Sequence, residues 1–185
     1  MHGPASPGWL LVALCAATGV SCVLRMRGGG VEQRRTAGAE ALMAFGMAAM
    51  AVPATVFSPP SWAWAGYAVV FGAAGVRALW AARAGAHHLH HAIGALAMVY
   101  MSLAMTVTAG QGPHLHGGPA GLPLLTGAFL VYFTGYVLVS GVRLMPVPEV
   151  AGVAPVSAGR GDRPELARAC RLSMGIAMMA MLMPL

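Results

Sequence analysis

Residues 87–105 read HHLHHAIGALAMVYMSLAM, an apolar run with histidines at one end and methionines along its length. A bilayer core requires roughly 20 predominantly apolar residues of helix, so this run predicts a membrane helix. At about 100° per residue, five of its side chains fall within one stripe less than a third of the helix circumference wide. These residues are His87, His91, Met98, Met101 and Met105.

Two other apolar segments repeat this pattern. In the second segment Glu40 is followed at helical spacing by three methionines, and in the last segment Arg171 is followed by three more. Aligned without gaps, the pairs are Met43 with Met174, Met47 with Met178, and Met50 with Met181. The central stretch fits this register, with His91 at the polar position and Gly94 in place of the first methionine. Three parallel helices would therefore stack thioether layers beyond one polar layer.

The composition is that of an integral membrane protein. Of the 185 residues, 58% are hydrophobic and 9% are charged, which is far from the average of soluble domains. The chain has no lysine, so its formal net charge of +6 comes from arginine alone. The arginines lie in short loops between apolar runs, which indicates membrane topology rather than a nucleic-acid-binding surface. We expect a single domain, 1–185, in a lipid bilayer, with no nucleic acid partner.

Six apolar segments predict an all-α bundle of six transmembrane helices. Their bounds are about 8–24, 38–57, 62–84, 88–108, 121–142 and 166–185. With the N-terminus outside, the loops 25–37, 84–87 and 143–165 face the cytoplasm, and every arginine and acidic residue lies in these loops or in the adjoining helix ends. This topology places the C-terminus outside too. The three methionine-bearing helices then run parallel, from the cytoplasm to the exterior.

Two charged side chains fall inside the apolar segments. Glu40 lies about one turn into the second segment, and Arg77 lies well inside the third. Charged groups at membrane depth usually face the bundle interior and have a partner. We therefore expect a buried ion pair of Glu40 with Arg77 or Arg171, and Glu165 is a second candidate partner for Arg77.

The methionine layers suit Cu(I). Thioether sulfur is a soft ligand that favours Cu(I), and imidazole binds copper as well as zinc. Weak, neutral ligands repeated along a path also allow an ion to be released. His87 and His91 lie one turn apart and can share a metal, and His114 and His116 in the sequence GPHLHGG (112–118) can capture copper at the outer mouth.

The same pattern has a structural interpretation. Methionine fills irregular gaps in helix packing, so the stripes can pack without binding a metal. Haem needs axial ligands from opposite sides, and only the fourth segment has histidines at membrane depth, so haem would need a dimer or a methionine ligand. Cys15, Cys22 and Cys170 are interpreted as helix-packing residues, although the last two share the cytoplasmic level and could hand on copper.

The leading hypothesis is a Cu(I)-binding membrane protein that moves or relays copper, with a copper donor or acceptor protein as its partner. The alternative is a structural or accessory subunit whose methionine stripes only pack. Stripes that converge inside the bundle would favour metal binding, and stripes that face lipid would favour packing. We do not expect an enzyme, because the sequence shows no nucleophile with a neighbouring base, no phosphate-binding loop and no paired carboxylates.

Three motifs carry a resemblance to a known family: EALMAFGMAAMAVP (40–53), HHLHHAIGALAMVYM (87–101) and PELARACRLSMGIAM (164–178). With the histidine-bearing loop before the fifth segment, they make the whole chain resemble small six-span membrane proteins of actinobacteria that have no established activity. This resemblance implies the topology and a bacterial plasma membrane.

The layers are also similar to the methionine-lined entrance of trimeric copper transporters of eukaryotic type. The MxxxM spacing found there is kept by Met43/Met47, Met101/Met105 and Met174/Met178. The GxxxG that follows it in those transporters is missing, so the similarity concerns the site and not the fold.

Overall fold

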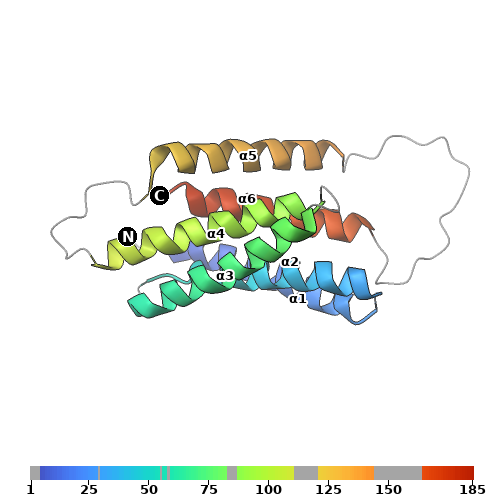
Figure 1. Cartoon of the computed structure of the whole chain (residues 1–185), viewed down its shortest axis with the longest axis horizontal. Coiled ribbons are helices and arrows are strands. Elements are labelled where there is room, and N and C mark those ends of the chain that lie inside the picture. Colours follow the sequence, from blue (N-terminus) through green and yellow to red (C-terminus); the bar gives the residue numbers. More distant parts are fainter. Residues whose placement is uncertain are drawn as a thin grey trace, which may run out of the picture.

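A computed structural model describes residues 5–28, 30–54, 56–57, 59–82, 87–110, 121–143 and 164–185. This part of the chain forms six α-helices and contains no strand. The helices are α1 (Ala5–Met26), α2 (Val31–Met50), α3 (Ser61–Ala82), α4 (His87–Gly110), α5 (Pro123–Val142) and α6 (Pro164–Leu182). The helix axes are roughly aligned along one common direction (Figure 1). The predicted all-α class is therefore confirmed.

The helices pack as three sequential pairs. Helix α1 packs against α2, α3 against α4, and α5 against α6. Helix α2 connects the pairs because it also contacts α4 and α6, and α1 contacts α6 as well. The odd-numbered helices run in one direction and the even-numbered helices in the other (Figure 1). The three methionine-bearing helices are therefore parallel, and α1 begins at the end of the bundle where α6 ends.

The second helix differs most from its predicted bounds, since it spans Val31–Met50 rather than 38–57. The prediction followed hydrophobicity, but the helical backbone begins in the charged residues before the apolar run. Glu32 lies in the first turn, where the helix dipole favours a negative charge. The helix ends after Met50 because Pro53 disfavours helical backbone at the residue before it. The other helix ends lie within about three residues of the predicted bounds.

Methionine, alanine and a few aromatic side chains make up the core. Met47 and Met98 are fully buried, together with Phe71 and Phe133. Buried alanines such as Ala44 allow the helices to approach closely, as small residues do in membrane bundles. Large apolar side chains remain on the outer surface, among them Leu10, Val20, Val69, Trp80, Leu124, Val131 and Leu138. An apolar exterior around a core of small residues and methionine is the arrangement that lipid favours.

Among the described residues, three helices are long and apolar enough to cross a membrane. The spans are Pro7–Met26 in α1, Leu89–Val107 in α4 and Pro123–Val142 in α5. Each belongs to a different helix pair. This composition is compatible with a membrane protein.

Candidate metal centre

The methionine stripes of α2, α4 and α6 face the interior of the bundle and pack together in one core cluster. Its buried methionines are Met43, Met47, Met98, Met101, Met174 and Met178. Met50 and Met181 are partly buried against the same cluster. Met105, at the far end of the α4 stripe, is 38% exposed and is not a member of this cluster. The stripes therefore converge in the interior, with the exception of this last position.

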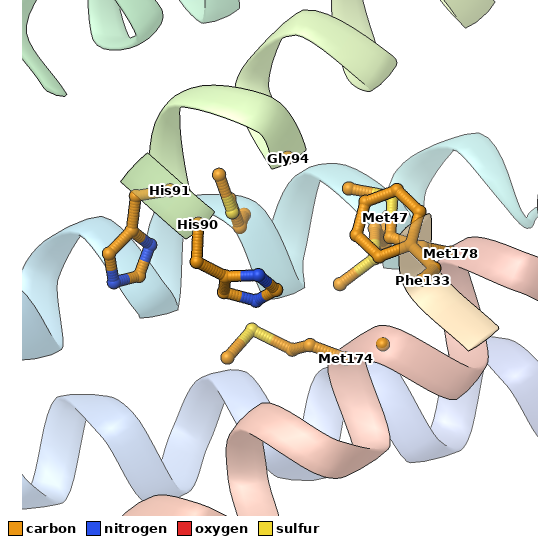
Figure 2. Close-up of a pocket in the computed structure, with 9 residues that line it drawn as sticks. Met47, His90, His91, Gly94, Phe133, Met174 and Met178 are labelled. Atoms are coloured by element: carbon orange, nitrogen blue, oxygen red, sulfur yellow. The ribbon is translucent and has the colours of Figure 1, made fainter. Parts of the chain in front are cut away.

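A small cavity lies within the cluster and is bordered by four helices (Figure 2). Its volume is about 10 Å³, roughly the space that one water molecule needs. The lining residues are Met43 and Met47 of α2, His90, His91 and Gly94 of α4, Phe133 of α5, and Met174, Gly175 and Met178 of α6. We call the four methionines and two histidines of this set the Met/His pocket. It brings soft sulfur and borderline imidazole ligands to one place.

Two tyrosines of α5 hold the ring of His90. The ring stacks on Tyr136, with 3.7 Å between the ring centroids and 11° between the planes. Its Nδ1 lies 3.2 Å from the hydroxyl of Tyr132. Because that nitrogen is engaged, Nε2 is the one that can bind a metal, and such a contact fixes the orientation of a ligating histidine. The ring of His91 lies next to it, with a centroid separation of 6.1 Å, and its side chain is buried.

The histidines of the pocket differ from the predicted set. The sequence-based stripe pairs His91 with His87 and omits His90, because the stripe ends at Met101. At about 100° per residue, His90 lies only about 20° beyond Met101, so a slightly wider stripe includes it. Helix α4 begins at His87, whose side chain lies outside the described residues. His114 and His116 lie outside them too.

One turn before the pocket, a buried ion-pair centre joins α1, α2 and α6. Glu40 is fully buried, and its two oxygens have different partners. Oε1 accepts a hydrogen bond from Nε of Arg171 at 2.7 Å, and Oε2 accepts one from Nη1 of Arg25 at 2.9 Å. These charge-assisted hydrogen bonds offset the cost of removing the carboxylate from water. The pairing of Glu40 with Arg171 was expected from the sequence, and the pairing with Arg25 was not.

The structure places Arg77 elsewhere. It is exposed on α3, about 200° around the helix from Gly75, whose position faces Ala95 of α4. Arg25 takes the expected place beside Glu40 because α1 continues to Met26 and carries this arginine into the interior. A signal for this was present in the sequence, since the Arg-Gly-Gly-Gly stretch 27–30 favours a short turn that brings the ends of two helices together.

In the described part of the chain, no group of three or more His, Cys, Asp or Glu side chains is arranged to hold a metal ion. Structural zinc sites are built from His and Cys groups of this kind. The candidate centre is therefore one of soft ligands, in which thioethers outnumber imidazoles.

Comparison with known proteins gives one match. The model of a domain of unknown function (DUF5134) matches residues 32–185, whereas no curated protein and no solved structure matches the chain. The matched region contains the whole Met/His pocket, and it contains Glu40 and Arg171 but not Arg25. Because the match covers most of its length, the chain belongs to the DUF5134 family.

Proposed function

We propose that this protein is a Cu(I)-binding, six-span integral membrane protein that moves or relays copper between α2, α4 and α6. The observation that carries the proposal is the Met/His pocket, in which thioethers of two helices and imidazoles of a third border one interior cavity. Thioethers are soft and uncharged, so they bind a monovalent soft cation without placing anions in the bundle. Copper is the cargo of this site.

The methionine layers beyond the pocket supply a path for the copper ion. Met98 and Met101 of α4 continue the buried sulfur core, and the partly buried Met50 and Met181 follow at its outer end. Transfer needs sites that bind strongly enough for the ion to enter and weakly enough for it to leave. Single thioethers at successive levels of parallel helices meet that need. A copper donor or acceptor protein would dock at the ends of this path.

The six-span topology in the cell membrane is part of the proposal. The described arginines lie towards the end of the bundle opposite the start of α1 and the end of α6 (Figure 1). The positive-inside rule assigns that end to the cytoplasm and both termini to the exterior. Each helix that is apolar enough to span packs against a sequence neighbour of similar length that runs the opposite way. Crossing of one member therefore favours crossing of the other.

The test replaces Met174 and Met178 of α6 with leucine. This exchange nearly conserves volume and usually costs under ~1.5 kcal/mol, so the variant should fold. We expect the Cu(I) affinity of the pocket, measured in detergent by competition with a weak Cu(I) chelator that leaves thiolate-bound copper in place, to fall about tenfold or more. The control exchanges Met179 and Met183, which lie on the same helix and do not line the pocket. Parent-like affinity in both double variants would overturn the proposal.

A second candidate function is that of a structural or accessory membrane subunit. Tight packing of Met98 favours it, since a Cβ at Gly46 would lie 3.1 Å from Met98 Cε. Flexible methionines fill such gaps without any metal. In that case the two double variants would differ from the parent only slightly in stability, and neither would differ in Cu(I) binding.

A further inference from the structure

A second group of soft ligands lies outside the Met/His pocket. Cys22 of α1 and Cys170 of α6 are 0% and 6% exposed, and they pack together with Ala41 of α2. Both are free thiols. Two helices from opposite ends of the chain therefore bring two thiol side chains into one buried cluster. We call these two residues the cysteine pair.

The cysteine pair lies against the ion-pair centre. Sγ of Cys22 is 3.7 Å from Oε2 of Glu40, the oxygen that also binds Arg25. With Arg171 on the other oxygen, two guanidinium charges and one carboxylate charge leave a net charge of +1. Nε of Arg25 is buried and has no hydrogen-bond partner among the described residues. A buried excess of positive charge is costly.

We propose that the cysteine pair is a second Cu(I) site, placed at the arginine-rich end of the methionine path. This inference rests on the proposed function for the identity of the metal. Binding breaks two S–H bonds and forms two Cu–S bonds, the two protons leave to solvent, and the copper stays Cu(I). The local charge gains one unit with the copper and loses two with the protons, so the net charge of +1 becomes zero. Nε of Arg25 can then donate a hydrogen bond to a thiolate.

The position of the cysteine pair suits transfer to or from the Met/His pocket. Cys170 precedes Met174 by four residues of α6, or about 6 Å along the axis at 1.5 Å per residue. The two sites are therefore consecutive steps for one ion. Thiolates carry a charge that thioethers lack, so they hold Cu(I) more strongly. The cysteine pair is thus the end of the path that binds copper more tightly. A thiol-bearing acceptor protein can take the metal from it.

Proton release distinguishes the two sites. Thioethers and neutral imidazoles bind Cu(I) without losing protons, whereas a thiol pair must lose two. The experiment titrates the full chain in detergent with the Cu(I)–acetonitrile complex, without oxygen and with a thiol-free reductant. It records bound copper and released protons together. We expect the parent protein to bind two copper ions and to release two protons. Copper binding by the parent without proton release would overturn the cysteine site, and this measurement needs no variant.

Variants assign the protons to residues. Cys22→Ser/Cys170→Ser should lose one copper ion and both protons. Cys15→Ser is the matched control, because Cys15 is equally buried on α1 but packs among the apolar core residues, and it should behave as the parent. Met174→Leu/Met178→Leu should keep one copper ion and both protons, so failure of the Met/His pocket alone leaves this inference standing. Undiminished proton release in the double serine variant would contradict it.

Discussion

Gly94 of α4 lies against the thioether of Met43 in α2. A Cβ at Gly94 would stand 2.9 Å from Met43 Cε and 3.2 Å from Met43 Sδ. Helix α4 thus has a glycine at the level where α2 and α6 have Met43 and Met174. The missing side chain leaves the space through which Met43 reaches the cavity, so Gly94 positions a candidate ligand without being one.

This contact predicts that Gly94→Ala impairs the site more than the fold. Alanine is favoured over glycine inside a helix by roughly 0.5–1 kcal/mol, and the methyl end of Met43 can rotate away. We therefore expect thermal stability in detergent at or above that of the parent, with Cu(I) affinity reduced about tenfold. Gly135→Ala on α5 is the matched control, since an added Cβ there meets no atom within 4 Å. Equal Cu(I) affinities of the two variants would contradict the prediction.

Removal of the Glu40 carboxylate should destabilise the bundle strongly. Glu40→Ala leaves Arg25 and Arg171 without their shared partner, and an uncompensated buried charge typically costs ~3–5 kcal/mol. We expect the lower part of this range, because the Arg171 side chain is 27% exposed and partly solvated. Thermal unfolding in detergent measures the loss. Glu165→Ala, at an exposed position in the first turn of α6, should stay within ~0.5 kcal/mol of the parent. An unchanged transition for Glu40→Ala would show that the ion pairs contribute little.

The fold was largely predictable from periodicity, because apolar runs of bilayer length have few alternatives to helix. The alternating direction of the helices then follows from the predicted topology, in which each successive apolar run crosses back over the bilayer. Two of the details that failed depend on backbone outside the apolar runs. Helix α2 begins at Val31 within a charged segment, and Arg25 enters the core only because α1 extends past the apolar run. Arg77 faces outward because α3 presents Gly75 and Phe71, rather than its arginine, to the interior.

Only those parts of the candidate site that follow from the position of a residue on its own helix could be predicted from the sequence. Periodicity places Met43, Met47, Met174 and Met178 on stripes, since a stripe needs no knowledge of neighbours, and the structure adds that these stripes face the interior. His90 borders the pocket with its ring packed against α5, although it lies about 20° outside the predicted stripe. Periodicity alone does not resolve an angular difference of that size. The cysteine pair depends on the packing of the first helix against the last, which no local pattern encodes.

The orientation of His90 predicts different effects for two substitutions. His90→Phe keeps an aromatic ring on Tyr136 but removes both nitrogens, so we expect Cu(I) affinity to fall about tenfold or more at small cost in stability. Tyr132→Phe removes only the hydroxyl that holds Nδ1, and a smaller loss should follow. Tyr100→Phe is the control, because its hydroxyl bonds Thr126 and does not border the pocket. Chelator competition measures all three, and the interpretation is wrong if His90→Phe binds as the parent does.

The distribution of arginines predicts the topology of the bundle. A labelling experiment on both ends of α2 can test separately how this helix is oriented and whether it crosses the membrane. Gly28 and Ala54 are exposed just beyond opposite ends of α2, and the native cysteines are buried, so an introduced cysteine should react far faster than they do. In intact cells we expect a membrane-impermeant maleimide to label Ala54→Cys, and to label Gly28→Cys only after permeabilisation.

The parent protein, treated in the same way, gives the background. Labelling of Gly28→Cys alone from outside would reverse the orientation while leaving α2 as a span. Labelling of both positions from the same side would show that α2 does not cross. The second result would also remove the copper path, because thioethers stacked along parallel helices can carry an ion across a bilayer only if those helices cross it.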